Sequence, residues 1–452
     1  MPAKNMNDLV ALCKRRGFVF QGSEIYGGLA GLYDYGPNGV ELLKNIKNAW
    51  WNSMVYQRDD VDGLDAAILS ARMLWKYSGH EGSFADPLVI CKKCSHRMRQ
   101  DKMKDPTKCE SCGSSDLNDP IDFKQMMGLC VGASTTGEIN AYLRPETATT
   151  TYTNFRNVMD STSRKIPFGM VQIGKAFRNE IAPRGFLFRM QEFEQAELQY
   201  FVNPKESNAQ YEVWKAARME WWIDVLGIPA VSLRFHPHDK LSHYARTAFD
   251  IEYNFPDGFD EVEGIHHRQD FDLGSHTKAQ SEFNIQAKVI ENKDSTTKLN
   301  YADAQTSENY IPHVIETAMG VGRAVMAVLH NAYTEEDLCD GNSRVVLKLK
   351  PTLSPVKAAV IPLARNVPEM LEISEKIAAD LRKLNLGRIM IENSGNIGKN
   401  YRRHDEIGTP VCITVDHETL TDGQVTVRDR DTMEQRRVPI DEVTGLVKEI
   451  VQ

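Results

Sequence analysis

Apolar residues recur every three or four positions in several stretches of the chain, and this spacing predicts amphipathic helices. The clearest run places Val40, Leu43, Ile46, Trp50 and Trp51 on one face, which predicts a helix over about residues 39–55. Similar runs predict helices over residues 6–16, 206–226 and 368–384. The Gly-rich segment 27–37 lies just before the clearest run, and its glycines and proline favour turns and extended backbone over helix.

Alternation of apolar and polar residues predicts strands in other segments. Two such segments fall within residues 168–201 on either side of the loop 181–185, so we expect them to pair as antiparallel strands. Residues 314–333 should open as a strand and continue as a helix.

Two prolines, Pro351 and Pro355, precede a different pattern in the last hundred residues. There, strands are expected at 360–362, 388–391 and 411–415, with the predicted helix 368–384 between the first two. Strands that alternate with helices indicate a small α/β domain whose middle strands run parallel. We therefore divide the chain of 452 residues into residues 1–350 and 351–452.

Charge and hydropathy narrow the class of protein. The formal charge of −8 does not mark a nucleic-acid binder, although a local basic face could still bind phosphates. No segment approaches the roughly 20 apolar residues of a membrane span, and the N-terminus lacks the apolar run of a signal peptide. We expect a cytoplasmic protein that does not associate with membranes.

Cysteine spacing predicts a metal site. Four of the eight cysteines form the pairs Cys91-x2-Cys94 and Cys109-x2-Cys112, which mark a zinc-ribbon-like insert over about residues 88–118. Four thiolates fill a tetrahedral site, so a Zn2+ ion bound there would be structural. The cysteines without such spacing are expected to be buried thiols; they are Cys13, Cys130, Cys339 and Cys412.

Three segments carry candidate chemistry. The first is Phe177-Arg178-Asn179-Glu180. The second is Arg189-Met190-Gln191-Glu192-Phe193, which the predicted hairpin returns beside the first. The third is Gly320-Val321-Gly322-Arg323, where two glycines precede an arginine in the first turn of a helix. Guanidinium groups can hold phosphates and an aromatic ring can stack on adenine, so the set indicates carboxylate activation by ATP.

Carboxylates gather in the same part of the sequence. A site for an amino acid and Mg2+ with ATP needs several of them, to hold an ammonium group and a divalent cation. The candidates are Glu146, Glu192, Glu194, Glu197, Glu261, Glu263 and Glu316.

Taken together, these segments resemble the class II aminoacyl-tRNA synthetases, specifically the dimeric glycyl type. The segment Gly31-Leu32-Tyr33-Asp34-Tyr35-Gly36-Pro37 is similar to the first class motif, and the arginine segments are similar to the second and third. Arg144-Pro145-Glu146-Thr147-Ala148, Phe193-Glu194-Gln195-Ala196-Glu197 and the string 398–410 are close to segments of the glycine enzymes. The resemblance covers nearly the whole chain.

The resemblance implies an α+β fold: an antiparallel sheet with flanking helices over 1–350 and an anticodon-binding α/β domain over 351–452. It implies a homodimer that activates glycine with ATP to glycyl-adenylate, and then transfers the glycyl group to the 3′ end of tRNA(Gly). Positioning and charge stabilisation would supply most of the acceleration, because neither step needs a covalent enzyme intermediate.

The resemblance also implies roles for single residues. Arg178, Glu180 and Arg323 would be catalytic. ATP would be bound by Arg178, Asn179, Glu180, Phe188, Arg189, Phe193, Glu261, Val262, Gly320, Val321, Gly322 and Arg323. Glycine would be bound by Arg99, Glu146, Phe193, Glu194, Gln195, Ala196, Glu197, Glu316, Ala318 and Gly320.

The chain departs from the family pattern at two places. It has Glu316-Thr317-Ala318 where Glu-Pro-Ser is usual, and Thr149-Thr150-Thr151 after the segment that contains Glu146. Weaker exclusion of alanine is therefore a hypothesis, because a pocket distinguishes one methylene by only about 1–3 kcal/mol.

Three alternatives stay open at this point. A catalytically inactive relative would lack the phosphate-binding arginines, which this chain keeps. A ligase for a carrier protein would be expected to lack the C-terminal domain. A class II synthetase for another small amino acid is the third.

Overall fold

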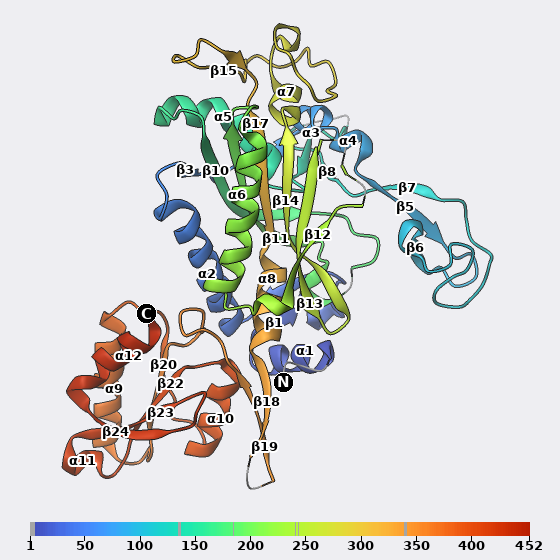
Figure 1. Cartoon of the computed structure of the whole chain (residues 1–452). Coiled ribbons are helices and arrows are strands. Elements are labelled where there is room, and N and C mark those ends of the chain that lie inside the picture. The colour runs from blue at the N-terminus through green and yellow to red at the C-terminus, as the bar shows by residue number, and fades with distance from the viewer. Residues whose placement is uncertain (1–4, 134–136, 184, 240, 243, 339–340) are drawn as a thin grey trace.

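The computed structural model describes residues 5–133, 137–183, 185–239, 241–242, 244–338 and 341–452. A seven-stranded sheet forms the centre of the larger part of the molecule, and a five-stranded sheet lies in the C-terminal part (Figure 1). No helix among these residues combines the length and the apolar character needed to cross a bilayer.

The large sheet is antiparallel except at one edge, where β3 runs parallel to β10. Its order is β12-β13-β14-β17-β11-β10-β3. The predicted hairpin is present, because Phe168 pairs with Phe201 and Phe177 with Glu192. The strands are β3 (Val61–Gly63), β10 (Phe168–Phe177), β11 (Glu192–Val202), β12 (Leu233–Pro237), β13 (Thr247–Phe255), β14 (Gly258–Gln269) and β17 (His313–Gly320).

Both faces of this sheet are covered. Helices α2 (Pro37–Trp51), α6 (Ser207–Glu220) and α8 (Val321–Ala332) share one large hydrophobic core with it. On the other face, α5 (Ala148–Thr162) and α7 (Phe271–His276) bury Tyr152, Phe155 and Leu273 in a second core. Single turns of π-helix, Asn52–Tyr56 and Trp221–Val225, extend α2 and α6 to about the predicted ends.

Smaller elements surround the sheet. A module of three strands, β5, β6 and β7, stands away from it at the right of Figure 1. The elements are α1 (Met6–Arg15), β1 (Val19–Gln21), β2 (Tyr33–Tyr35), β4 (Leu69–Ala71), α3 (Arg72–Tyr77), α4 (His80–Ser83), β5 (Ala85–Ile90), β6 (Arg97–Arg99), β7 (Ile121–Lys124), β8 (Met127–Leu129), β9 (Ala141–Leu143), β15 (Tyr301–Ala302) and β16 (Asn309–Tyr310).

The C-terminal part contains the second sheet, with the order β21-β20-β22-β23-β24. As predicted, its middle strands are parallel: β20 (Ala358–Pro362) pairs with β21 (Ile389–Ile391) and with β22 (Val411–Val415). Helices α9 (Pro368–Lys383) and α12 (Val443–Val451) pack on one face, and α10 (Ile397–Ile407) packs on the other. The remaining elements are α11 (Thr419–Asp422), β23 (Gln424–Asp429) and β24 (Gln435–Pro439).

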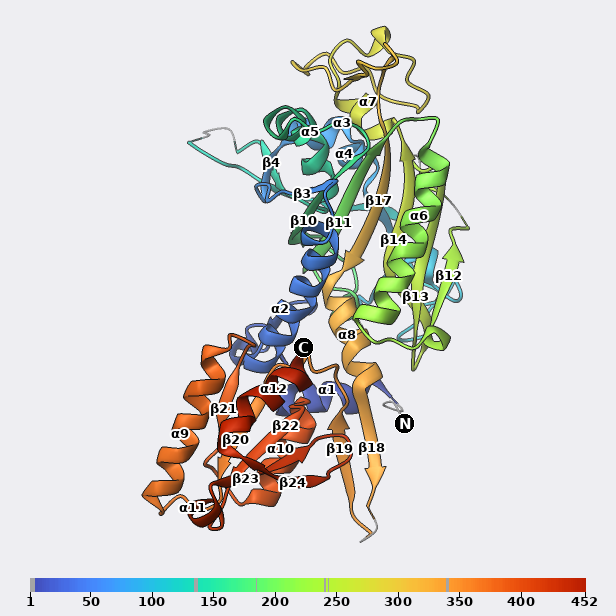
Figure 2. The same ribbon diagram turned by 60° about the vertical axis from the view of Figure 1, so that its left-hand side comes forward.

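The hairpin of β18 (Tyr333–Asp337) and β19 (Ser343–Leu347) follows α8 and reaches the C-terminal part (Figure 2). There, Arg344 of β19 lies 3.2 Å from the carboxylate of Asp405 on α10, and both side chains are buried. A buried ion pair therefore joins α10 to the chain segment that leaves α8.

The cysteines outside the two Cys-x2-Cys pairs differ in burial. Cys13 and Cys412 are buried, as predicted, whereas Cys130 is exposed, so that prediction was wrong. Cys130 follows the edge strand β8, which has no further strand to cover it. Cys339 lies outside the described residues.

Candidate active site

A cavity of about 440 Å³ lies over the sheet strands β11, β14 and β17. Its lining includes most of the predicted site residues: Arg99, Glu146, Arg178, Glu180, Phe188, Arg189, Phe193, Glu194, Gln195, Glu197, Glu261, Glu316, Ala318, Gly320, Gly322 and Arg323. Segments far apart in the sequence thus meet in one place.

Arg178 follows the last residue of β10 and lies between two aromatic rings. Its guanidinium carbon is 5.3 Å from the ring centre of Phe193 and 5.4 Å from that of Phe84. The Nε atom donates a hydrogen bond of 3.0 Å to the carbonyl oxygen of Pro145. These contacts fix the plane of the guanidinium while its terminal nitrogens stay available for an anion.

Arg323 lies in the first turn of α8 and is held on both sides. Its Nε donates to the carbonyl oxygen of Phe188 at 3.2 Å, and its guanidinium lies 4.2 Å from the Phe188 ring centre. Its Nη1 is 3.0 Å from the Glu261 carboxylate. The helix dipole adds a second attraction for anions at this end of α8.

A β-bulge in β14 decides which carboxylates reach the cavity. The register with β13 pairs Ile251 with Glu263 and Glu252 with Glu261, so Val262 is the extra residue of the bulge. Glu261 therefore lines the cavity, whereas Glu263 lies on the opposite face and accepts a hydrogen bond of 2.6 Å from Arg218 of α6.

Three carboxylates gather at the end of the cavity near α5. Glu146 accepts a hydrogen bond of 2.7 Å from Thr149 and lies 3.2 Å from His80. Glu197 accepts one from Thr147, and Glu316 accepts hydrogen bonds of 3.1 Å from Arg268.

These surroundings shift the three pKa values in different directions. Burial, reinforced by the Glu316 and Glu146 carboxylates, raises the pKa of Glu197 to about 8. Burial would also raise the pKa of Glu146 and Glu316, but His80 lowers the first and Arg268 lowers the second below the ordinary value. The group thus holds two carboxylates that favour ionisation and one that stays protonated near neutral pH.

The floor of the cavity next to these carboxylates carries little side-chain bulk. Glu197 of β11 pairs with Ala318 of β17, which pairs with Gly264 of β14. The His266 ring lies directly over Gly264, where an added Cβ would come within 2.7 Å of its Cε1 atom, so this position accepts only glycine.

Some of the predicted residues do not line the cavity, and one that does is already paired. Glu194 lines the cavity, but its carboxylate forms an ion pair of 3.1 Å with Lys47 of α2, so its charge is already compensated. Six predicted residues do not line the cavity: Asn179, Glu192, Ala196, Val262, Glu263 and Val321. Four of these are fully buried: Ala196, Val262, Glu263 and Val321.

Sequence reasoning missed several lining residues. Arg268 forms ion pairs with Glu316 and with Asp272, and all three side chains are buried. His266 and Tyr244 lie beside it, and His80 contacts Glu146 from α4. With Glu316 taken to mark the cavity face of the sheet, strand alternation could have indicated that Arg268 lies on the same face. Nothing in the sequence connects His80 to Glu146.

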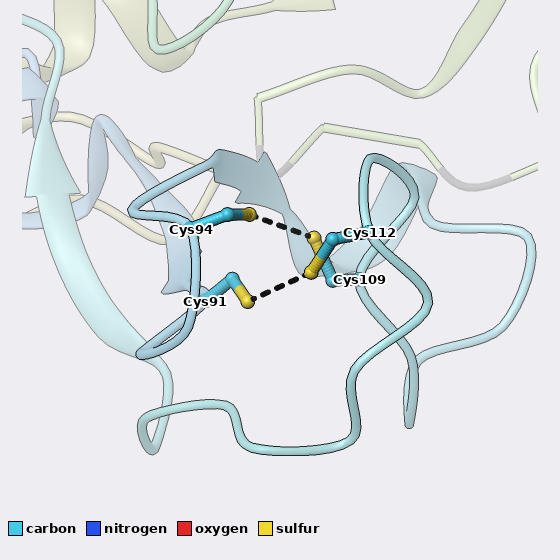
Figure 3. A group of neighbouring side chains, drawn as sticks. All are labelled: Cys91, Cys94, Cys109 and Cys112. Carbon is cyan, nitrogen blue, oxygen red and sulfur yellow. Dashed lines mark hydrogen bonds between the residues drawn. The ribbon is translucent and has the colours of Figure 1, made fainter.

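The four knuckle cysteines meet in the three-stranded module (Figure 3). The Sγ atoms of Cys91 and Cys112 lie 3.6 Å apart, as do those of Cys94 and Cys109, and all four lie within 4.8 Å of one another. A tetrahedral zinc site with Zn–S bonds of about 2.3 Å places its sulfurs about 3.8 Å apart. The donor set and its spacing therefore fit Zn2+.

Comparison with known proteins agrees with this arrangement. Residues 134–332 match the family described as tRNA synthetase class II core domain (G, H, P, S and T), and residues 357–450 match the family described as anticodon binding domain. The chain is 47% identical to "Glycine--tRNA ligase" from Deinococcus radiodurans, over 99% of both chains, and equally so to that of Thermus thermophilus. The protein of the same name from Borrelia garinii is also 47% identical, over 98% of this chain and 97% of its own.

Solved structures share the fold at low identity. A prolyl-tRNA synthetase from Cryptosporidium parvum, solved with L-proline and AMP, superposes with a TM-score of 0.62 at 15% identity. The superposition covers 98% of this chain and 75% of that one.

Proposed function

This chain belongs to the glycine--tRNA ligase family of class II aminoacyl-tRNA synthetases, and we propose on that basis that it activates glycine with ATP and transfers it to tRNA(Gly). The observation that carries the proposal is a single cavity in which arginines face carboxylates across a floor of Ala318 and Gly264. Phosphates and an ammonium group can bind at its two ends, and the His266 ring over Gly264 leaves little room there for a substrate side chain, which favours glycine.

Arginines would act on the triphosphate. In the first step, a glycine carboxylate oxygen attacks the α-phosphorus, and pyrophosphate leaves. Arg178 would contact the α-phosphate and stabilise the charge that builds up there, while Arg323 would hold the γ-phosphate at the start of α8. Phe193 would stack on adenine and Glu180 would accept a hydrogen bond from the adenine amino group.

Glutamates would act on the amino acid. Glu146, Glu197 and Glu316 would surround the glycine ammonium, since all three line the cavity. The Glu261 carboxylate offers oxygen ligands to Mg2+, which when bound would neutralise phosphate charge. In the second step, a hydroxyl of the terminal adenosine takes the glycyl group, and AMP leaves.

Pyrophosphate exchange with each of the twenty amino acids tests this function. Glycine should support ATP–pyrophosphate exchange, and every other amino acid should support far less. Exchange that depended on serine or alanine more than on glycine would assign the enzyme to another amino acid, and exchange with none would remove the proposal. The glycine-to-alanine ratio also measures whether Ala318 weakens exclusion of alanine.

Glycine affinity should rise with pH because Glu197 is protonated near neutral pH. Its pKa is raised to about 8, so the side chain is mostly uncharged at pH 7. An ammonium group favours the ionised form, so binding releases a proton, and affinity should increase about fivefold from pH 7 to pH 8. Calorimetric titration in two buffers with different ionisation enthalpies measures both the affinity and the proton.

The variant Glu197→Gln should lose the pH dependence and the proton release. Glu192→Gln is the matched control, because Glu192 lies on the same strand, pairs with Lys175 at 2.6 Å, and is absent from the cavity. Affinity that did not change between pH 7 and pH 8 in the unmodified protein would contradict the assignment of Glu197.

A zinc-ribbon-like insert is the second part of the proposal. Cys91, Cys94, Cys109 and Cys112 would hold one Zn2+ ion. Four thiolates leave no open position, so this ion would support structure and take no direct part in the chemistry.

tRNA would bind the C-terminal part, which we take as residues 351–452, through a basic cavity of about 510 Å³ at α10. Its lining includes Arg16, Lys399, Arg402 and Arg403. Arg403 is paired with Glu392 at 2.7 Å, whereas Arg402 is paired more loosely, with Asp405 at 3.5 Å, and the two side chains are about equally exposed. Lys399 and Arg402 are therefore the better candidates for phosphate contacts.

Lys399→Ala and Arg402→Ala should each lower kcat/KM for aminoacylation about three- to tenfold and leave pyrophosphate exchange nearly unchanged. Each removes a charge that would contact tRNA, and neither residue lines the reaction cavity. Lys383→Ala is the control, since this exposed lysine pairs with Asp380 on α9. An equal loss in both assays would contradict the separation of the two sites.

A homodimer in the cytoplasm completes the proposal. Ile25 and Tyr26 are each 87% exposed, and Leu29 is 54% exposed, in the segment just before the motif that resembles the dimer-forming motif of the family. A second copy of the chain would cover these apolar side chains.

A further inference from the structure

The cysteine module, residues Ala85–Lys124, connects the sulfur cluster to the reaction cavity. Strand β5 ends one residue before Cys91, and β6 begins three residues after Cys94. At their other ends, Asp86 of β5 and Arg99 of β6 line the cavity. Both strands therefore run from the first cysteine knuckle to the cavity wall.

Arg99 depends on this module for its position. Leu88 pairs with Arg99 on one side and with Ile121 of β7 on the other. The Arg99 guanidinium lies 2.9 Å from the Asp86 carboxylate and 2.7 Å from that of Asp101. Each partner belongs to the module, so any movement of the β5–β6 pair moves the arginine.

Phe84 extends the connection to Arg178. It precedes β5 directly, and its ring centre lies 5.4 Å from the Arg178 guanidinium carbon. At the end of β7, the carbonyl oxygen of Gln125 accepts a hydrogen bond of 2.8 Å from the backbone of Asn179. The residues that directly precede and follow the module thus contact the Arg178 segment at two points.

The module has too small a core to hold this arrangement by itself. Its buried apolar residues are Leu88, Val89, Met98 and two of the cysteines, Cys91 and Cys109. So few apolar side chains do not stabilise an independent fold, whereas a four-thiolate metal site does. The first knuckle is closed as a turn, since the carbonyl oxygen of Cys91 accepts a hydrogen bond of 2.8 Å from the backbone N–H of Ser95.

We propose that metal binding at the four cysteines positions Arg99 and Phe84 at the reaction cavity, so that metal occupancy controls the rate of amino-acid activation. The proposal rests on the proposed function and on the fit of the four sulfurs to Zn2+. Arg99 is a positioning residue for the bound reactants, and the metal acts on it through β5 and β6. Loss of the metal should loosen the module and leave the large sheet folded.

Metal removal from the full-length protein tests this. Zn2+ is withdrawn with a chelator under reducing conditions, its stoichiometry is measured, and Cys112→Ser provides a second route to the metal-free module. Backbone hydrogen exchange should speed up at least tenfold over residues 85–99 and stay unchanged over residues 313–332. The kcat/KM for glycine-dependent exchange should fall about tenfold or more.

Two variants distinguish a loss of activity that acts through Arg99 from a general loss of structure on metal removal. Arg99→Ala should lose much of this factor with the metal bound, and metal removal should then cost clearly less than in the unmodified protein, because only the route through Phe84 remains. Arg97→Ala is the matched control: this arginine is exposed on the same strand and lies outside the cavity lining, so the variant should keep full activity and full metal sensitivity.

Three results would overturn the proposal: a purified protein that binds no stoichiometric Zn2+, a metal-free protein with unchanged hydrogen exchange and kinetics, or an equal further loss in Arg99→Ala. Failure of the proposed function looks different. In that case the metal-bound protein shows no glycine-dependent exchange, while hydrogen exchange over 85–99 still responds to the metal.

Discussion

Arg178→Ala should lower glycine-dependent pyrophosphate exchange about a thousandfold. The guanidinium lies between Phe84 and Phe193 and is fixed by the carbonyl oxygen of Pro145, so it needs no reorganisation when charge develops on a phosphate. Preorganised donors of this kind contribute most in the transition state, so the loss should appear mainly in kcat. Steady-state exchange at varied ATP and glycine concentrations measures it.

Two controls belong with this variant. Arg178→Lys keeps the charge but not the planar fork, and should recover part of the lost rate. Arg156→Ala removes a partly exposed arginine that pairs with Asp160 on α5 at 2.9 Å, and should leave the rate unchanged. If Arg178→Ala kept more than about a tenth of the activity while folding normally, its role at the α-phosphate would be wrong.

Asp405→Ala should destabilise the C-terminal part by about 3–5 kcal/mol. Its carboxylate accepts hydrogen bonds of 2.8 Å and 3.1 Å from Arg428 and one of 3.2 Å from Arg344. Both arginines are buried, so the substitution leaves two guanidinium groups in the interior without this partner. Urea unfolding followed by probes in each part of the chain measures the change.

The matched control is Asp380→Ala, which removes an exposed carboxylate that pairs with Lys383 on α9 and should change stability by less than about 1 kcal/mol. Asp405→Asn keeps the shape but loses the charge, and should fall between the two. A loss below about 1 kcal/mol for Asp405→Ala would show that solvent or neighbouring carbonyl groups compensate the arginines.

The fold follows closely from periodicity where a segment is long and one-sided. The helix over 39–55 buries one clear face. The strands of the hairpin within 168–201 are buried on both faces, so their antiparallel pairing was predictable from the connecting loop, whereas their register was not. The meeting of the four knuckle cysteines was also predictable, because two Cys-x2-Cys pairs have the spacing that suits a tetrahedral metal site.

The candidate site was predictable only in part. The cavity combines Arg178, Arg323 and Glu316 as expected, but the bulge at Val262 separates Glu261 from Glu263 and no local pattern marks it. Alternation alone would have placed both carboxylates on one face. Lys47 and His80 act on Glu194 and Glu146 from distant helices, and contacts of that kind depend on tertiary structure.

The cavity floor has a mechanical consequence for substrate choice. Gly264, Ala318 and Glu197 lie on β14, β17 and β11, and each of these strands is hydrogen-bonded to a neighbour on both sides. A bulkier amino acid could not push one strand aside without breaking a ladder of main-chain bonds. The enzyme would therefore reject larger substrates by the stiffness of its backbone, and softening that backbone would broaden its choice even if every side chain stayed the same.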